Sequence, residues 1–462
     1  MEGLTLLLGL VASAVVFLLP PVYALIAYIV ALAWYPAFLS VQLGTIDFTL
    51  RRIVIVALFA KLLLQTNLPG RFKFIWLDKL VIIYFGAQLL SGALTGTSLT
   101  AFFENRAGGA FDMVLPYFAV RMIVQTRQQY LTLLKWVMII SAPLAVIGLY
   151  QCVTGQNLLA FLRGPVVSES ASYTSKARLG LYRADTVFSH PIMYGLFFAV
   201  LGPVCAGILH SVRNHKTLYL AGLGFFAVGV FSSMSSGPLL AALLSMLFIA
   251  VWWWRKYWKP IVVTVIVLCG SVEIISNRHF YDVLGSFTLN PRTAWYRTRL
   301  VEVALFEGGM SGHWVTGYGY NADPGWGPKI DGRSHTDTVN HYILVLSRYG
   351  LVGLIPFLAM NIAVVRRLIR AYKASTGSRD KWLIWCLSGG YFGLAGALMS
   401  VSLFGQGDTV YYMLLGFGSV MPSLVKASQA ERLEGLLHRY RHPPRQRYAA
   451  RQLVQAAKAT FL

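Results

Sequence analysis

The chain has 462 residues, of which 56% are hydrophobic and only 13% are charged, and its mean hydropathy is +0.59. Soluble globular proteins carry about 25% charged residues, so this composition excludes an ordinary soluble protein. The net charge of +22 would suit a nucleic-acid-binding protein, but much of the excess lies in short loops between apolar segments and in the C-terminal tail. Cytoplasmic loops of membrane proteins show this distribution, so no nucleic-acid partner is expected.

Apolar segments follow one another at residues 4–19, 21–40, 52–66, 79–96, 108–125, 131–152, 191–209, 217–234, 237–254, 260–275, 341–365, 382–404 and 410–425. In lipid, an open chain satisfies its backbone groups within one segment only as a helix. We therefore predict an all-α polytopic membrane protein with about 12–13 transmembrane helices. The four cysteines lie singly in or beside these segments, so they are interpreted as small core residues.

Basic runs such as 121–127 and 366–370 alternate with the segments from residue 79 onward and mark cytoplasmic loops. The domains expected from this alternation are N-terminal transmembrane helices at 1–152, a first periplasmic loop at 153–190, central transmembrane helices at 191–275, a large, partly helical periplasmic catalytic loop at 276–340, C-terminal transmembrane helices at 341–425 and a basic cytoplasmic tail at 426–462. Arg51 and Arg52 do not fit, because they would lie outside if residues 52–66 formed a full span. The tail is predicted to be an amphipathic helix on anionic lipid or a solvated segment.

Arginines in the two outer loops are the first functional signal, because outer loops tend to lack them. Arg183 lies shortly before the segment that begins at Pro191, and Arg292, Arg297 and Arg299 follow in the second loop. Guanidinium groups bind phosphate at two points and stay charged. Two arginines from separate loops would therefore form a receptor for a lipid-linked diphosphate and would stabilise its charge as it leaves. For Arg183, a salt bridge to Asp185 or a lipid-headgroup contact is the alternative.

Aromatic side chains crowd the second outer loop, including Trp295, Tyr318 and Tyr320. Aromatic faces stack on sugar rings, so these residues predict a saccharide cleft. The alternative is the interfacial aromatic belt of membrane proteins.

The loop acids form no Asp-x-Asp pair and the loop histidines are scattered, so a metal-independent reaction without a cofactor is expected. If a sugar hydroxyl attacks, a general base is needed, and the candidates are His335, Asp337 and His341. His341 lies beside Asn340, which is predicted to bind the diphosphate or glycan, at the start of an apolar segment. A polar cluster at such a position also commonly caps a helix, which is the alternative.

Three motifs resemble one family. Residues 183–191, which run from Arg183 to Pro191, are similar to a segment of the form Arg-x-x-Gly-Thr-Phe-x-x-Pro. Residues 292–296, followed by the glycines of 317–320, are similar to an Arg-x-x-x-Trp/Tyr segment and a later Gly-x-Gly. Residues 340–353 are similar to a span-opening signature that ends in Gly-x-x-Gly. With these motifs the chain resembles the O-antigen ligase and polysaccharide polymerase superfamily of membrane glycosyltransferases of the C type.

The resemblance implies that Arg183 and Arg292 bind the diphosphate of an undecaprenyl-linked glycan. The resemblance identifies the general base less directly. Many members begin the last motif with His-Asn, whereas here Val339 precedes Asn340 and His341 follows it. The base would then be His341, His335 or Asp337, or arginine would dominate a mechanism without a strong base.

The implied reaction transfers a glycan from an undecaprenyl diphosphate donor to an acceptor hydroxyl, with inversion and without a metal. We predict a polymerase of O-antigen, exopolysaccharide or capsule whose acceptor is a second lipid-linked repeat, because residues 338–342 resemble exopolysaccharide-cluster members. An O-antigen ligase acting on lipid A–core is the alternative. The active site would face the periplasm from the bacterial cytoplasmic (inner) membrane. Membrane lipids, a chain-length regulator and a flippase are the partners that this assignment implies.

A transporter or flippase of a lipid-linked or anionic saccharide is the alternative from another class. It calls for charged or broken helices at the bilayer midplane and for two inverted halves. Few ionisable residues lie inside the apolar segments, namely Lys61, Lys135, Glu273 and Arg348, and no inverted halves are evident. A structural scaffold would leave the outer arginines and aromatic residues unexplained.

Overall fold

The computed structural model describes residues 2–36, 38–43, 46–65, 72–96, 107–162, 178–211, 216–275 and 291–440, apart from the side chains of 291–294, 435–440 and some positions in 258–273. The chain begins with α1 (Glu2–Leu18), α2 (Pro21–Trp34), the strands β1 (Ser40–Leu43) and β2 (Ile46–Thr49), α3 (Leu50–Leu64) and α4 (Trp76–Thr95). The two strands form an antiparallel hairpin in which Ser40 pairs with Thr49.

The middle of the chain consists of the π-helix η2 (Ala110–Val114), α6 (Leu115–Ile123), α7 (Arg127–Thr154), η3 (Ala160–Leu162), α9 (Pro191–Ala206), η5 (Gly207–His210), α10 (Lys216–Ser232), α11 (Ser236–Ala250), η6 (Val251–Tyr257) and α12 (Trp258–Ile275). The last third contains α14 (Pro291–Leu305), α15 (Gly327–Ile330), α16 (His341–Ala374), α17 (Ser378–Ala397) and α18 (Gln406–Tyr440). Each predicted apolar segment coincides with a helical segment.

Short polar signals set the helix boundaries, because the first N–H groups of a helix lack partners within it. Thr126 caps α7 by accepting a hydrogen bond from the Gln129 N–H, and α7 ends at Gly155, which has a φ of 76°. His190 caps α9 in the same way through its ring nitrogen, and Pro191 occupies the first helical position, where a proline loses no hydrogen bond.

Six helical segments of the described chain are long and apolar enough to cross a membrane: 76–95, 127–154, 191–210, 236–257, 341–374 and 406–434. Three shorter apolar helices, at 2–18, 21–34 and 216–232, accompany them. The all-α polytopic membrane class is therefore confirmed, with one small hairpin that was not predicted. The predicted catalytic loop is indeed partly helical, through α14 and α15. The helix expected at 410–425 is longer than predicted, because α18 continues into the predicted tail as far as Tyr440. Residues 441–462 lie outside the described part.

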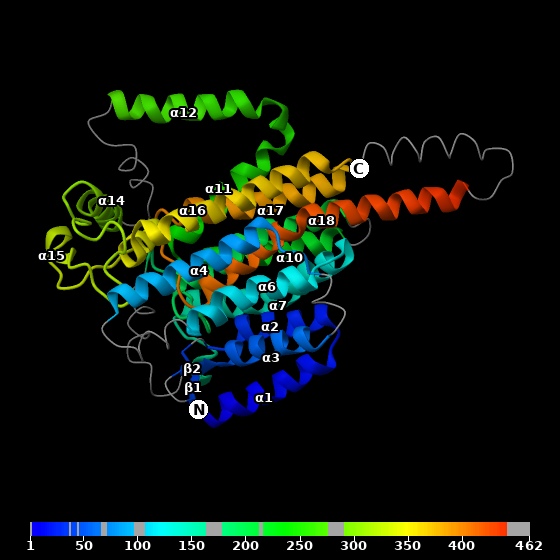
Figure 1. Ribbon diagram of the computed structural model, residues 1–462, viewed down its shortest axis with the longest axis horizontal. Helices are drawn as coiled ribbons and strands as arrows, with labels where there is room; N and C mark the ends of the chain where they lie inside the picture. Colours follow the sequence, from blue (N-terminus) through cyan, green and yellow to red (C-terminus); the bar gives the residue numbers. More distant parts are fainter. Residues whose placement is uncertain are drawn as a thin grey trace.

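The long helices lie side by side with alternating directions (Figure 1). Helix α4 packs against α16, and α9 and α11 pack against α17. The core between them contains buried aromatic residues such as Tyr84 and Phe357, whose ring centres are 5.5 Å apart. In Figure 1, α14 and α15 lie at one end of the bundle, and α12 lies apart from its main body.

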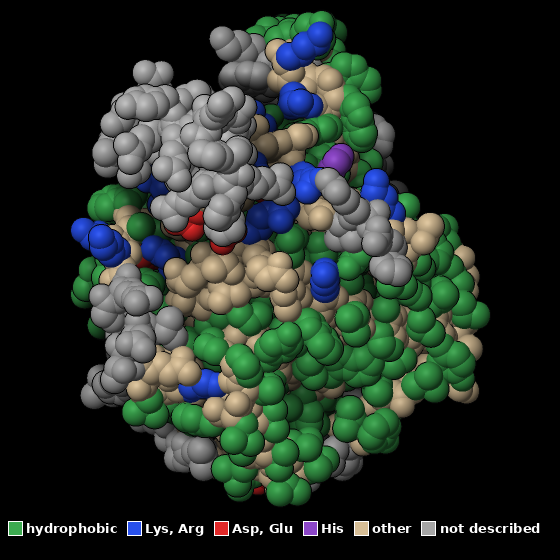
Figure 2. Space-filling model, turned by 90° about the vertical axis from the view of Figure 1, so that its right-hand side faces the viewer, with side chains coloured by type: hydrophobic (Ala, Val, Ile, Leu, Met, Phe, Trp, Pro, Cys, Tyr) green, Lys and Arg blue, Asp and Glu red, His purple; other side chains and the backbone are tan. Residues whose placement is uncertain are grey.

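The opposite end of the bundle carries many of the basic residues (Figure 2). Two buried aspartates join helices there. Asp380 forms ion pairs with Arg127 at 3.0 Å and with Arg432 at 2.8 Å, and Asp78 lies 3.5 Å from Arg121. Apolar side chains cover much of the remaining surface in this view. Many basic residues thus lie at the end of the bundle opposite α14 and α15.

Candidate active site

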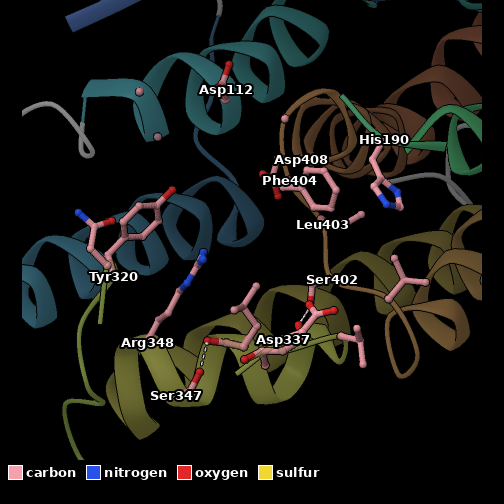
Figure 3. A pocket seen from close by; sticks show the side chains of 18 of the residues that line it. Asp112, His190, Tyr320, Asp337, Ser347, Arg348, Ser402, Leu403, Phe404 and Asp408 are labelled. Atoms are coloured by element: carbon pink, nitrogen blue, oxygen red, sulfur yellow. Dashed lines mark hydrogen bonds between the residues drawn. The ribbon is translucent and has the colours of Figure 1, made fainter. Parts of the chain in front are cut away.

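A polar cavity of about 1140 Å³ lies at the end of the bundle where α4 and α17 end and where α9, α16 and α18 begin (Figure 3). The charged residues that line it are Asp47, Arg51, Arg52, Asp112, Arg297, Asp323, Asp337, Arg348 and Asp408. Sites for drug-sized ligands measure about 300–1,000 Å³. The cavity therefore has room for several sugar rings together with a charged headgroup.

A break in α16 shapes the cavity. Gly350 has φ 60° and ψ −159°, a conformation open essentially to glycine alone. Segment 314–319 lies beside the break, and its first two carbonyls accept hydrogen bonds from the two backbone N–H groups after Gly350. The N–H groups of Tyr318 and Gly319 donate to the carbonyls of the residues at 347 and 348, before the break. These four hydrogen bonds measure 2.7–3.2 Å. Ser91 of α4 also donates to the Thr316 carbonyl at 2.7 Å. The glycines of two predicted motifs thus meet in one backbone joint.

This joint directs Arg348 into the cavity. The guanidinium carbon of Arg348 lies 4.6 Å from the ring centre of Tyr320, close enough for a cation–π interaction. Figure 3 shows the Arg348 side chain reaching toward the middle of the cavity, with Asp408 across from it. Within the described ranges, neither Arg348 nor Asp408 takes part in a salt bridge. Both side chains are therefore available to a ligand.

Arg51 and Arg52 from the first turn of α3 line another part of the cavity wall. Both bind Asp112 of η2, Arg51 at 3.1 Å and Arg52 at 2.7 Å. Their place at the cavity explains why they did not fit the alternation of basic loops. We call Arg51, Arg52, Asp112 and Arg348 the Arg51 cluster.

On a different wall, α14 contributes Arg297 and the segment before α16 contributes Asp337. The Asp337 N–H donates to the Tyr296 hydroxyl at 2.9 Å, which holds this segment against α14. Partial desolvation raises the pKa of Asp337, although this residue remains exposed and Arg333, His335 and Arg297 act in the opposite direction. Desolvation, with the nearby charge of Arg178, lowers the pKa of Arg297, which still stays charged at neutral pH.

His190 completes this wall. Its Nδ1 accepts a hydrogen bond from the Ile192 N–H at 3.1 Å. Burial, and then the charges of Arg183 and Arg178, lower the pKa of His190 to about 3, so its ring is neutral at physiological pH. We call Arg297, Asp337 and His190 the Arg297 cluster.

Arg183, the predicted diphosphate ligand, is buried close to His190 rather than lining the cavity. Its Nη2 donates to the Ser235 hydroxyl at 2.8 Å. The neighbouring Asp185 accepts a hydrogen bond from Gln151 at 2.8 Å, which ties the first loop to α7. Arg292 lies in the first turn of α14, the helix that carries Arg297, but its side chain is outside the described part.

Other predicted ligands have structural partners. Arg299 binds Glu302 at 2.9 Å and also pairs with Glu307, and it is not part of the cavity wall. Trp295 is 52% exposed and likewise does not line the cavity. Asn340 caps α16 by accepting hydrogen bonds from two backbone N–H groups at 3.0 and 3.2 Å, which agrees with the capping interpretation.

Of the predicted aromatic ligands, Tyr318 does not line the cavity and Tyr320 does. Tyr318 stacks on His313 with ring centres 3.9 Å apart, and its hydroxyl donates to the Gly309 carbonyl. Tyr320 is the predicted aromatic residue that lines the cavity, where it lies beneath Arg348.

The three candidate bases also lie in different environments. His341 is buried, its Nδ1 accepts a hydrogen bond from the Leu403 N–H at 3.2 Å, and its ring packs on Phe357. His335 is exposed and does not line the cavity. Asp337 alone of the three belongs to the cavity wall. This geometry favours Asp337.

Sequence reasoning did not assign Arg51, Arg52, Asp112, Arg348 or Asp408 to the site. Two signals were nevertheless present. Arg51 and Arg52 broke the charge alternation, and Arg348 was an ionisable residue inside an apolar segment, a position that often marks function.

Among the described residues, no group of three or more His, Cys, Asp or Glu side chains is arranged to hold a metal ion. No family model matches the chain, and no curated protein matches it. A chain of a solved peptidoglycan synthase complex, studied for the coordination of polymerization and crosslinking, is similar at 15% identity. The match covers 76% of this chain and 97% of that chain with a TM-score of 0.39, and similarity at this level carries no argument about function.

Proposed function

We propose that this protein is a membrane glycosyltransferase that transfers a glycan from an undecaprenyl diphosphate donor to a hydroxyl of a second lipid-linked repeat. The observation that carries the proposal is the large cavity at one end of the helical bundle, lined by arginines and carboxylates from loops and helix ends. Such a cavity can receive a charged headgroup and sugars while the lipid tail stays in the bilayer. The motif resemblance points to the same reaction.

The donor diphosphate is assigned to the Arg297 cluster. Arg297 lines the cavity and lies on the same helix as Arg292, and Arg183 is close to His190 on the adjoining wall. As the bond between the anomeric carbon and the diphosphate oxygen breaks, negative charge grows on the leaving oxygen. Fixed guanidinium groups stabilise that charge most in the transition state, which accelerates the reaction.

Asp337 is assigned as the general base. The acceptor hydroxyl oxygen forms the new bond to the anomeric carbon, and its proton moves to the Asp337 carboxylate. A pKa above the usual range of aspartate makes this carboxylate a better proton acceptor. Attack opposite the leaving diphosphate inverts the anomeric carbon. In the neutral ring of His190, Nδ1 accepts a hydrogen bond, so the proton lies on Nε2 and can be donated in a hydrogen bond.

The assignment places the cavity on the periplasmic side, since basic residues gather at the opposite end of the bundle. We prefer a polymerase to a ligase because residues 338–342 resemble the motif variant of exopolysaccharide-cluster members. The transporter alternative has weaker support. The break at Gly350 and the charge of Arg348 are features that it requires, but no pair of inverted halves is evident in the sequence.

The test is glycan analysis of a deletion strain complemented with Arg297→Gln, Asp337→Asn or the wild-type gene. Lys329→Gln serves as the control, because Lys329 is exposed on α15 and does not line the cavity. We expect both cavity variants to lose long polymer and to accumulate single lipid-linked repeats, with wild-type polymer in the control. Long chains stranded on undecaprenyl diphosphate would identify a ligase instead. Normal polymer in both cavity variants would exclude the glycosyltransferase assignment.

A further inference from the structure

The Arg51 cluster contains guanidinium groups that the protein itself does not fully use. Arg51 is only 6% exposed, and its Nε and Nη2 both bind Asp112. Its Nη1 is buried and has no hydrogen-bond partner among the described residues. A buried polar group without a partner costs about 1–3 kcal/mol. Arg51 also lines the cavity, so its positive charge acts on a ligand there.

Other features of this wall favour an anion. Arg348 reaches toward the same region, and its guanidinium forms no salt bridge within the described chain. The wall begins at the N-terminus of α3, a helix of 15 residues whose first N–H groups carry partial positive charge. Gly108 leaves space for Arg52: a Cβ at Gly108 would lie 2.8 Å from the Arg52 Nη2.

Carboxylates also border this wall. Asp112 is shared by Arg51 and Arg52, so this trio keeps one net positive charge. Asp47 contributes its backbone carbonyl to Arg52 at 2.7 Å, and Asp408 lies opposite Arg348. Arg348 therefore faces Asp408 across the cavity without closing an ion pair, so its guanidinium can bind a phosphate group.

The Arg51 cluster is separate from the Arg297 cluster. Figure 3 shows Asp112 and Asp337 on opposite walls, with Arg348 reaching between them. The electrostatic neighbours differ as well. Arg52 interacts with Asp112, Asp47 and Tyr320, whereas Arg297 interacts with Arg178 and Asp337. One cavity thus contains two cationic groups.

We propose that the Arg51 cluster is a second phosphate-binding subsite, which holds the diphosphate of the lipid-linked acceptor while the Arg297 cluster holds that of the donor. This inference rests on the proposed function, and it specifies the acceptor as a second polyprenyl diphosphate. Two anion sites in one cavity suit a transferase whose donor and acceptor both carry a diphosphate. A salt-bridge cluster with only a structural role would need no excess of positive charge facing the cavity.

The test counts lipids bound to the purified full chain by native mass spectrometry, with undecaprenyl diphosphate as the probe. Undecaprenol, which lacks phosphate, gives the number of lipids that bind through the tail alone. We expect two phosphate-dependent molecules on the wild type and one on Arg348→Gln. The variant Arg51→Gln should also bind one, because Asp112 stays paired with Arg52 and the trio then carries no net charge. The apparent Kd for the second molecule should rise about ten- to a hundredfold, as expected for a lost charge-assisted contact.

The subsite is overturned if the wild type never binds more than one phosphate-dependent lipid, or if both variants still bind two with unchanged Kd. Lys329→Gln is the control and should bind two. Arg297→Gln should lose the other molecule, which separates the donor from the acceptor subsite. Glycan analysis in cells decides the proposed function independently. If the wild type binds two phosphate-dependent lipids but Arg297→Gln still makes normal polymer, the subsite stands and the transferase assignment fails. If the wild type binds only one phosphate-dependent lipid and Arg297→Gln loses polymer, the transferase assignment stands and the subsite fails.

Discussion

The backbone joint at Gly350 gives a sharp test of how the site is built. In Gly350→Ala, the new Cβ would overlap the Val315 carbonyl and lie 2.6 Å from the Thr316 N. Neither atom can move freely, because segment 314–319 is bonded to α16 on both sides of the break. The backbone conformation alone costs a non-glycine residue about 1–3 kcal/mol. Losing part of the four joint hydrogen bonds, at about 1 kcal/mol each, brings the expected destabilisation to about 3–5 kcal/mol.

Gly312→Ala is the matched comparison. Gly312 also has a positive φ, of 77°, but a Cβ there would meet nothing within 4 Å. Its cost is therefore the left-handed conformation alone, about 1–2 kcal/mol. Purified variants in the same detergent would be heated at one scan rate, and unfolding followed by tryptophan fluorescence. A single scan rate is needed because membrane proteins of this size often unfold irreversibly.

We expect Gly350→Ala to lower the unfolding midpoint clearly more than Gly312→Ala, and to weaken undecaprenyl diphosphate binding because Arg348 loses its direction. Equal midpoints for the two variants would show that segment 314–319 can move away from α16. The account of how the joint positions Arg348 would then be wrong.

Three further predictions concern the cavity. In a purified transfer assay, Arg297→Gln should lower kcat by about 10²–10³-fold through lost charge stabilisation, whereas Arg299→Gln should change it less than threefold, since Arg299 pairs with glutamates away from the cavity. Asp337 must be deprotonated to act as base and its pKa is raised, so activity should increase with pH through a limb that lies above the usual aspartate value of about 3.9, and an acidic limb at or below that value would contradict this role. His341→Ala should destabilise the protein by about 1–3 kcal/mol by leaving the Leu403 N–H without its acceptor, and it should leave the pH profile of the remaining activity unchanged; a lost acidic limb would instead identify His341 as the base.

Hydropathy predicted the helical frame well, because it is a local property of the chain. The apolar segment at 131–152 coincides with α7, and Thr126 and Gly155 set its ends. Asn340 behaves as the helix cap that its position suggested. The π-helix at 110–114 and the break inside α16 were not predicted. Both depend on which backbone groups a neighbouring segment supplies, and no local pattern encodes that.

The sequence by itself determined that this is a helical membrane protein with arginine-rich and aromatic polar loops at one end. Only the tertiary structure decided which of these residues share a cavity. Arg297, Tyr320 and Asp337 line it, whereas Arg299 pairs with neighbouring glutamates. Arg51 joins it from a helix some 250 residues earlier in the chain (297 − 51 = 246). The physical reason is that spacing along a chain fixes which residues share a helix face, while a cavity forms where several helix ends meet, and that meeting is set by packing across the whole bundle.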